Sequence, residues 1–529
     1  MSSRNKRNLL TVLGLTLSLS LPSVVSAAPA DGWLKSASLF EIRTLAGQSE
    51  WGHANGAASA STFFHPRSLL ELSDGRVVVS DSGNNMIRVV KAGQVSTLTG
   101  LYIGDDSAGL PLGSNKDGQS SEAGFNLPMG VAADGQGAIY VADSGNHSIR
   151  KIAKDGTVTT LAGNGNIGQT DGKGANAAFY SPSDVAVDAQ GNVYVADTLN
   201  NVIRKISPDG TVSTVTATFT RPIEYFPGAV EYAGDFADGP IATARFNEPS
   251  GLAIDAKGNL YVSDRGNQRI RYIDFGTGKV TTVAGGGSYA AQAPYIEGDY
   301  VDGAAGTARF NAPEGIAIAQ DGTLIVADSL NHAVRLIRNG QVTTLTGVAT
   351  EFGQADGVPG SAQFNHPTDV AVLSDGRLAI SDEYGNKLRV LQPYSKPANF
   401  AAGKTVQLLL DGKLLKPEVA PRLKDGSVLI PLRSLGESLG YTFTWDPKTS
   451  TAVMSKGSVS YSITKGSKNV TKTTVGTAST DNQKLVLNGT PITANDRFLV
   501  PVRFFATESG YDIQWDAQAN AVIIRSKSL

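Results

Sequence analysis

A pattern that recurs six times along the chain constrains its fold more than any other feature. Each copy contains a Phe-x-x-Pro phrase, an apolar segment, and a second apolar segment that ends in an Asp fifteen residues after the Pro. The prolines are Pro66, Pro128, Pro182, Pro249, Pro313 and Pro367, and the acids are Asp81, Asp143, Asp197, Asp264, Asp328 and Asp382. A fixed period of this kind is typical of repeat architectures, in which each repeat packs against its neighbours.

Within one copy, turn residues divide the sequence into four short segments. In the second copy the expected strands are residues 130–134, 138–143, 148–152 and 157–162. Asp-Gly and Gly-Asn pairs between β-rich segments predict hairpin turns. Four antiparallel strands make one blade of a β-propeller, so six copies predict six blades.

The sixth copy lacks its fourth strand. After Leu391 the chain continues with Gln392-Pro393, whereas the missing phrase occurs before the first copy, where residues 42–47 match residues 158–163. We therefore expect the N-terminal strand to complete the last blade and close the ring, because closure removes open sheet edges.

The repeated polar residues are expected to be structural. An Arg follows each strand-end Asp by seven residues, and a short hairpin brings such positions together, which predicts an ion pair in every blade. Asn at the third position after the Asp, as in Asn84 and Asn146, is predicted to be a left-handed turn residue. His147 and His332 each lie at the next position of the turn, and we interpret both as structural. The Asp-Gly pair before each repeat, as at Asp117, favours a turn over a calcium site.

Phrases of the type YVAD-x-x-N-x-x-I-R resemble the NHL repeat family, over about residues 37–395. The resemblance implies a six-bladed propeller that acts mostly as a binding platform. Related six-bladed propellers include metal-dependent lactonases and a peptide-amidating lyase, so the fold alone does not determine the activity.

The remainder of the chain contains a second, internally doubled unit. VLIPLR at residues 428–433 is echoed by FLVPVR at residues 498–503. Each phrase leads into a predicted helix, at residues 434–439 and 504–509, followed by a Gly-Tyr stop and a strand with Trp-Asp. The expected fold class is therefore mainly β: a six-bladed β-propeller, then a small α+β domain made of two similar strand–helix–strand halves.

These phrases resemble the copper amine oxidase-like N-terminal domain. The region contains no His, no Cys and one Met, Met454. Copper needs imidazole or sulfur ligands, so we predict no copper and no oxidase, and a role as a stalk or cell-envelope contact. The expected domains are the propeller at residues 37–395, a linker at 396–404 and this domain at 405–529.

The first residues predict export. Arg4, Lys6 and Arg7 precede an apolar run at residues 9–21 that is too short to span a bilayer. With a cleavage site after Ala27, residues 1–27 are a predicted signal peptide. The expected location is extracellular, with cell-wall association as an option and no stable membrane insertion. The chain has no Cys and a net charge of −2, which predicts no disulfides and no nucleic-acid partner.

Two long connections between repeats, residues 216–245 and 286–309, carry aromatic side chains next to acids. Variable loops on a rigid frame often hold binding sites, and aromatic rings beside carboxylates suit sugars, peptides or cations. Packing within the loops is the alternative. The predicted ligand-binding residues are Tyr225, Phe226, Tyr232, Tyr289, Tyr295 and Tyr300.

The residues after each Pro differ between copies and are expected at the mouth of a central tunnel. Asp184, Glu314 and Asp369, with His65 and His366, could converge on a divalent cation. The His spacing does not define a zinc site, and no other cofactor is expected.

The leading hypothesis is a secreted or cell-envelope protein with a binding or scaffold role. A non-enzyme is favoured because no Ser-His-Asp set is recognisable in the sequence. Its propeller face would bind a glycan or peptide ligand, with a cell-wall glycan, a peptide or a protein as partner. One alternative is a metal-dependent hydrolase or lyase with its site at the tunnel mouth. Another is a structural envelope component whose C-terminal domain contacts the cell wall.

Overall fold

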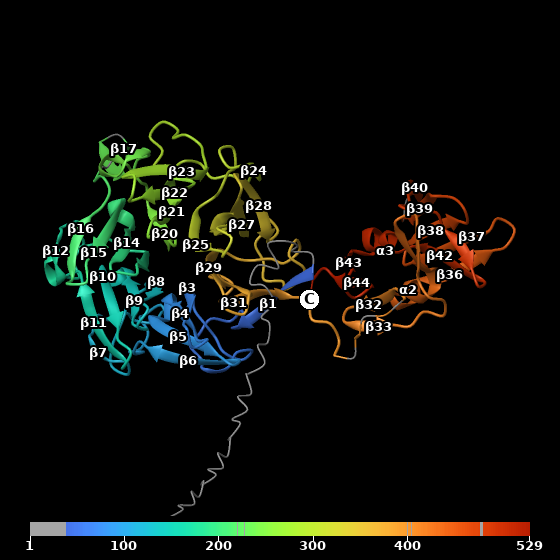
Figure 1. Cartoon of the computed structure of the whole chain (residues 1–529), viewed down its shortest axis with the longest axis horizontal. Helices are drawn as coiled ribbons and strands as arrows, with labels where there is room; N and C mark the ends of the chain where they lie inside the picture. Colours follow the sequence, from blue (N-terminus) through green and yellow to red (C-terminus); the bar gives the residue numbers. More distant parts are fainter. Residues whose placement is uncertain are drawn as a thin grey trace, which may run out of the picture.

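The computed structural model describes residues 39–218, 221–226, 228–398, 400–401, 403, 405–476 and 480–528, without the side chains of residues 225, 226, 506 and 507. The predicted signal peptide lies outside these residues. The described chain forms a ring of sheets and a smaller C-terminal body (Figure 1). Among the described residues, no helix has the length and apolar character needed to cross a membrane.

In the described ring, six antiparallel sheets surround a common centre, and five of them share one strand order (Figure 1). From the outer to the inner edge these are β2 (Gly56–Ala57), β6 (Gln94–Thr99), β5 (Met86–Lys91), β4 (Val77–Asp81) and β3 (Pro66–Glu71); β7 (Gly118–Gln119), β11 (Thr157–Ala162), β10 (Ser148–Ile152), β9 (Ile139–Asp143) and β8 (Pro128–Ala133); β12 (Gly172–Lys173), β16 (Thr211–Thr214), β15 (Val202–Ile206), β14 (Val193–Asp197) and β13 (Asp184–Val187); β19 (Gly239–Pro240), β23 (Lys279–Gly285), β22 (Arg269–Asp274), β21 (Leu260–Asp264) and β20 (Pro249–Ile254); and β24 (Gly303–Ala304), β28 (Gln341–Thr346), β27 (Ala333–Arg338), β26 (Leu324–Asp328) and β25 (Pro313–Ile318). The four long strands of each blade confirm the prediction. The two-residue outer strand was not predicted, because so short a strand shows no alternation of apolar residues.

The sixth blade is completed by the start of the ring, as predicted. It contains β1 (Phe40–Ala46), β31 (Lys387–Pro393), β30 (Leu378–Asp382) and β29 (Pro367–Val372). β1 pairs antiparallel with β31, with Ile42 opposite Leu391. Both of these side chains are fully buried in one apolar cluster. The ring is therefore closed by backbone pairing and by a shared core.

Apolar side chains fill the space between neighbouring blades. One cluster combines Val78 and Ile87 of the first blade with Phe125 and Val131, which lie at and beside β8 of the second. Because each blade buries one apolar face against the next, the hydrophobic effect holds the ring together around its circumference.

The C-terminal body contains three small sheets and two short helices (Figure 1). The sheets are β33 (Lys413–Leu415), β32 (Gln407–Leu410), β44 (Ala521–Ser526) and β43 (Tyr511–Asp516); β34 (Arg422–Lys424), β35 (Ser427–Pro431), β42 (Arg497–Pro501) and β41 (Ile492–Ala494); and β36 (Thr442–Asp446), β37 (Thr451–Lys456), β38 (Val459–Thr464), β39 (Asn469–Val475) and β40 (Thr480–Val486). The helices are α2 (Leu432–Ser438) and α3 (Val502–Ser509). Both begin two residues before the predicted start, directly after a Pro that suits a helix entry.

The two halves of this body are related by a local two-fold axis. β35 and β42 pair antiparallel with Ile430 opposite Val500, Leu429 opposite Pro501, and Pro431 opposite Leu499. Residues 429, 430 and 431 correspond to residues 499, 500 and 501, so exchanging the halves reproduces the same pairing. The axis passes between Ile430 and Val500, and the same offset of 70 residues relates β37 to β44.

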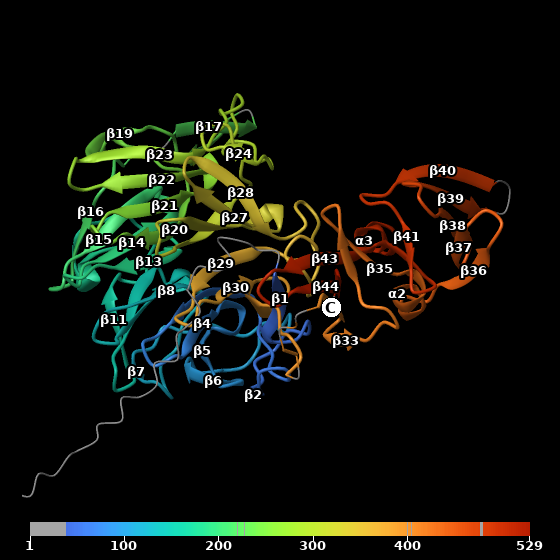
Figure 2. The ribbon, with the colours of Figure 1, turned by 45° about the vertical axis from the view of Figure 1, so that its right-hand side comes forward.

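The last strand of the body contacts the closing blade of the ring. Figures 1 and 2 both show β44 beside β1. The Arg525 Nη1 group donates a hydrogen bond to the carbonyl oxygen of Phe40 at 2.8 Å, and the Val358 N–H donates to the carbonyl of Lys527 at 3.1 Å. Arg525 is buried and also pairs with Asp512 at 2.5 Å. These bonds join the two bodies.

Candidate functional site

Each blade contains the predicted Asp–Arg pair, and both side chains of every pair are fully buried. In the second blade, Arg150 Nη1 lies 2.7 Å from Asp143 Oδ2, and Nη2 lies 2.7 Å from Asp117 Oδ1. The guanidinium also lies 5.0 Å from the centroid of the Phe125 ring. Burial raises the pKa of Asp143 to about 6, against the opposing effect of Arg150. These acids are parts of the scaffold, and the Asp of the Asp-Gly turn takes part in it.

The left-handed residue of each turn lies one position later than predicted. Asn146 ends a short 3-10 turn, and its amide donates to Asp143 Oδ2 at 2.8 Å. The next residue, His147, has φ of 49°. The prediction for Asn84 and Asn146 was wrong, because a 3-10 turn uses right-handed backbone and the left-handed residue caps its end.

The side chain of each left-handed residue accepts a hydrogen bond from the following blade. The donor is the backbone N–H of the residue before the repeated Pro of that blade, and this donor residue also has a positive φ. The six inter-blade bonds are Leu127 to Asn85 (2.8 Å), Ser181 to His147 (3.1 Å), Glu248 to Asn201 (2.9 Å), Ala312 to Gln268 (2.7 Å), His366 to His332 (3.2 Å) and His65 to Asn386 (3.1 Å). His147 and His332 accept through Nδ1, so both must be unprotonated at that atom.

At the centre of the ring, the inner strands leave a cavity of only about 40 Å³. Asp184 Oδ2 accepts the Leu252 N–H at 2.7 Å, and Asp369 Oδ2 accepts the Ser68 hydroxyl at 2.8 Å. Burial raises the pKa of Asp369 to about 6 and raises the pKa of Asp184, to which the charge of Asp369 adds. A cavity of this size holds a few water molecules and no larger ligand.

The mouth of this cavity is covered by ion pairs. Arg67 lies between two acids, 2.8 Å from Glu383 and 3.0 Å from Glu314. Arg265 pairs with Glu248 at 2.9 Å and lies 3.6 Å from Glu314. Burial lowers the pKa of Arg67, but Glu314 and Glu383 raise it by more, so its guanidinium stays charged. The centre of this face thus holds two arginines paired with three glutamates.

The structure places the predicted metal ligands around one axis but gives each of them another partner. Asp184, Glu314 and Asp369 line the central cavity. His65 and His366 lie outside it, with their rings 4.9 and 4.5 Å from the ring of Tyr384. Within the described residues, no group of three or more His, Cys, Asp or Glu side chains is arranged to hold a metal ion. The divalent cation stays a prediction.

The predicted aromatic loop residues have different environments. The Tyr289 hydroxyl donates to Asn267 at 2.6 Å and its ring lies 4.0 Å from the Arg221 guanidinium, so it packs within the loop. The Tyr300 ring lies 4.6 Å from the guanidinium of the buried Arg335. Tyr295 is exposed and donates to Glu248 at the mouth, and Tyr232 is exposed on the hairpin of β17 (Arg221–Phe226) and β18 (Ala229–Ala233). The side chains of Tyr225 and Phe226 lie outside the described residues.

A series of rings that was not predicted crosses the face on one side of the mouth. We call it the aromatic arc, and it consists of Trp51, Phe64, His65, Tyr384, His366, His332 and Phe352. Successive ring centroids are 4.9, 4.4, 4.9, 4.5, 4.8 and 6.0 Å apart. Trp51 at one end is 52% exposed, Phe352 at the other is 71% exposed, and Tyr384 between them is 43% exposed.

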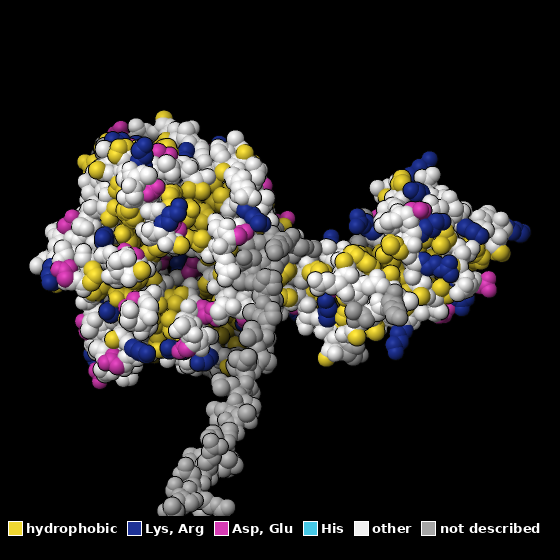
Figure 3. All heavy atoms as spheres, in the orientation of Figure 1, with side chains coloured by type: hydrophobic (Ala, Val, Ile, Leu, Met, Phe, Trp, Pro, Cys, Tyr) yellow, Lys and Arg dark blue, Asp and Glu magenta, His cyan; other side chains and the backbone are white. Residues whose placement is uncertain are grey.

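The arc belongs to a more widely apolar rim. Figure 3 shows hydrophobic side chains distributed around the centre of the ring, where acidic and basic side chains lie. Trp51, Ile167 and Phe352 occupy equivalent places, each bridging to the buried Phe of its own repeat. Their sequence signal was a bulky apolar residue twelve positions before that Phe, in a connection where polar residues are the norm.

Comparison with known families agrees with this architecture. The NHL repeat model matches residues 125–152, 179–206, 246–271 and 310–335, and the copper amine oxidase N-terminal domain model matches residues 409–524. The chain carries NHL repeats and a copper amine oxidase N-terminal domain. The structure extends the four matched NHL repeats to six blades, of which the sixth is completed by β1.

Curated proteins are similar to large parts of this chain. NHL repeat-containing protein 2 of Bos taurus is 30% identical over 398 residues, which cover 69% of this chain and 52% of the relative. The protein SUPPRESSOR OF QUENCHING 1 of Arabidopsis thaliana is 31% identical over 287 residues, which cover 52% of this chain and 26% of the relative. The chain thus spans about half or less of the length of these relatives.

Among solved structures, an auxiliary nutrient binding protein from Bacteroides ovatus matches with a TM-score of 0.48 and 16% identity, over 67% of this chain and 77% of that chain. The NHL propeller itself supports a binding or scaffold role, because its repeated polar residues serve the ring and three rings of the aromatic arc are exposed.

Proposed function

We propose that this protein is a secreted or cell-envelope binding protein whose NHL propeller binds a glycan or a peptide at the aromatic arc. The single observation that carries the proposal is the arc itself: exposed rings at both ends and in the middle, on a rigid frame. Contact between an exposed aromatic ring and the apolar face of a sugar or a side chain stabilises the complex, because both apolar surfaces are removed from water. The export part of the proposal rests on the residue pattern at 1–27.

The frame suits binding because it is preorganised. Each ring of the arc is anchored on a blade, and the bond from His366 to His332 fixes two of them across a blade boundary. A ligand then loses little affinity to ordering of the protein.

The contacts of the mouth favour binding over the hydrolase or lyase alternative. Glu314 is paired with Arg67, and Asp184 and Asp369 accept backbone or hydroxyl hydrogen bonds. A hydrolytic site needs a group left available to move a proton or to hold an activating metal.

The experiment is a glycan and peptide array probed with the full chain and with Trp51→Ala, Phe352→Ala and Tyr232→Ala. We expect the first two variants to lose the wild-type ligands by at least about tenfold in affinity, the scale of a lost aromatic contact at a binding hot spot. Tyr232 is exposed on the β17–β18 hairpin and tests the loop hypothesis separately. Retention of the same ligands by both arc variants would refute the proposal.

A further inference from the structure

Among the described residues of the C-terminal body, one pocket lies beside Trp445 and another lies beside Trp515. The first has a volume of about 510 Å³ and the second about 320 Å³. Each takes residues from both halves of the body: the first combines Leu432 and Trp445 with Phe498, and the second combines Val502 and Trp515 with Val428. Neither pocket uses any residue of the propeller.

The two pockets are copies of each other under the two-fold axis described above. Eleven residues line the smaller pocket, and every one of them has its counterpart, 70 positions away, among the thirteen that line the larger. Arg433 corresponds to Arg503, Trp445 to Trp515, and Glu418 to Asn488. The duplicated sequence therefore carries a duplicated cavity as well as a duplicated fold.

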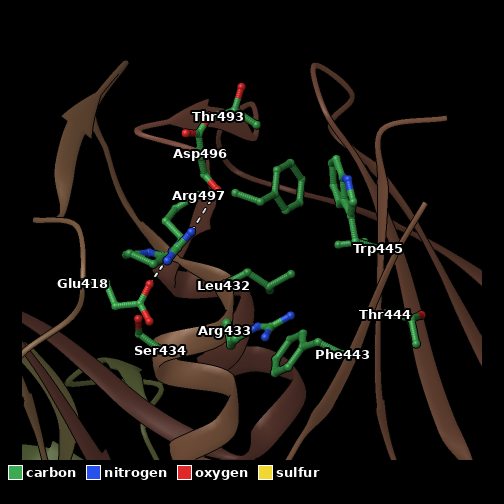
Figure 4. A pocket seen from close by; sticks show the side chains of 13 residues that line it. Glu418, Leu432, Arg433, Ser434, Phe443, Thr444, Trp445, Thr493, Asp496 and Arg497 are labelled. Carbon is green, nitrogen blue, oxygen red and sulfur yellow. Dashed lines mark hydrogen bonds and ion pairs between the residues drawn. The ribbon is translucent and has the colours of Figure 1, made fainter. Parts of the chain in front are cut away.

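Each pocket offers one indole ring, with the guanidinium groups of Arg433 and Arg497 at the first pocket and that of Arg503 at the second. Trp445 is 43% exposed and Trp515 is 44% exposed, an equal and large exposure for the largest apolar side chain. In Figure 4 the Trp445 side chain lies on one side of the first pocket and the Arg497–Glu418 ion pair on the other. The Trp445 ring contacts the Phe498 ring, with centroids 5.4 Å apart, which holds the indole in place.

The net charge of the C-terminal body indicates the sign of the charge on its ligand. Residues 405–529 carry 15 Lys and Arg against 10 Asp and Glu, a net charge of +5, whereas residues 1–404 carry 31 against 38, a net charge of −7. Figure 3 shows Lys and Arg side chains spread over the C-terminal body. A positive field raises the local concentration of an anionic ligand, and an Arg pairs with a carboxylate through two parallel hydrogen bonds.

We propose that the C-terminal body is a bivalent module for an acidic polysaccharide, with one sugar-binding pocket at Trp445 and a second at Trp515. Each indole stacks on the apolar face of a sugar ring, and Arg433 or Arg503 pairs with the carboxylate of that sugar or of the next one. This inference does not depend on the propeller ligand, because the two sites share no residue.

A ligand that is a repeating polymer can occupy both copies of the pocket at once. Two modest sites on one rigid body engage a single chain together, and the second contact forms at a high effective concentration. A short oligosaccharide fills the two pockets separately, whereas a long polymer gains avidity from both.

The test is calorimetric titration of the full chain with a galacturonic acid trisaccharide, which serves as the probe. We expect two sites in the wild type, one site in Trp445→Ala, one in Trp515→Ala, and none in the double variant. For polygalacturonate, each single variant is expected to weaken binding by about a hundredfold, the lower end of an avidity gain. Two sites in either single variant, or no binding by the wild type, would overturn the proposal.

Matched variants separate a lost pocket from a lost fold. Val486→Ala removes an exposed apolar side chain of β40 outside both pockets, and Trp51→Ala removes an exposed ring on the propeller. Both are expected to keep two sites. Arg433→Gln and Arg503→Gln leave the indoles intact and are expected to weaken each site about tenfold, the value of one charge-assisted pair. A neutral maltotriose is expected to bind at least tenfold more weakly, and equal binding of both trisaccharides would contradict the acidic specificity.

Discussion

The backbone N–H of His366 donates a hydrogen bond to Nδ1 of His332 across the boundary between the fifth and sixth blades. The same link in other blades ends on the side-chain oxygen of Asn or Gln. At two of the six boundaries, therefore, the ring is joined through an atom that can take up a proton.

The bond from His366 to His332 predicts a dependence of stability on pH. Burial lowers the pKa of His332 from its usual 6.5 to about 4, and the charge of His366 adds to the effect. Between these values the unfolded chain binds more protons than the native one, so this contribution is complete above pH 6.5 and is lost as the pH falls toward 4. We expect a loss of about 1 kcal/mol at pH 5, less than the full value because the ring is partly solvated.

The measurement is the difference in unfolding free energy between the wild type and His332→Asn at pH 7 and pH 5. Asn accepts the same bond in the first and third blades and does not titrate. The difference cancels the buried acids, such as Asp143, whose raised pKa acts with the opposite sign. An equal pH dependence in both proteins would contradict the assignment.

The buried arginine of each blade should be needed for stability. Arg150→Ala leaves Asp143 buried without its partner, and removal of one member of a buried pair costs about 3–5 kcal/mol. Arg76→Ala is the control, because Arg76 pairs with Asp74 at 2.7 Å but both are exposed, and such pairs contribute about 0–1 kcal/mol. Urea unfolding of the two variants should show the large effect for Arg150 alone.

The glycine next to the central cavity should not tolerate a side chain. A Cβ atom on Gly130 would lie 2.1 Å from Asp184 Oδ1, and overpacking of this kind costs about 1–3 kcal/mol. Gly135, in the exposed turn after β8, has no atom within 4 Å of the same position. We expect thermal unfolding to show a lower midpoint for Gly130→Ala and little change for Gly135→Ala; equal midpoints would show that the cavity can expand.

The contact between the two bodies should depend on Arg525. Arg525→Ala removes the bond to the Phe40 carbonyl and leaves Asp512 without its guanidinium, so we expect the C-terminal body to separate from the ring. Small-angle scattering would report this as a larger radius of gyration. Arg422→Ala, at an exposed position of β34, should leave the radius unchanged. An unchanged radius for Arg525→Ala would mean that backbone contacts such as the bond from Val358 to Lys527 are sufficient to hold the two bodies together.

The sequence predicted correctly those features in which the same residue type recurs at the same position of every blade. The blades, the closure by residues 42–47 and the Asp–Arg pairs follow from periodicity alone, because each repeat must satisfy the same buried groups. The repeated Pro did not reveal the positive φ before it, since the residue before a Pro ordinarily avoids that region. The N–H of each such residue donates a hydrogen bond to a side chain of the preceding blade, and the sequence of one repeat does not show that bond.

The site was harder to predict because it is built from irregular positions. Tyr289 and Tyr300 stood out in the sequence, but Tyr289 packs within its loop and Tyr300 packs on the buried Arg335 of the fifth blade. Trp51 and Phe352 lie about 300 positions apart and belong to one arc only because the ring closes between the sixth blade and the first. The arc is a property of the closed ring and is absent from any single repeat.

The position of β1 in the sixth blade also has a consequence for how the molecule is made. Glu41 of β1 and Gln392 of β31 are 351 positions apart. β1 therefore has no partner strand until the residues of β31 are available to pair with it. Contacts of such long range are slow to form. Pairing of β1 with β31 is the step that closes the ring. Until it occurs, an unpaired strand of a neighbouring chain competes with β1 for the open edge of β31.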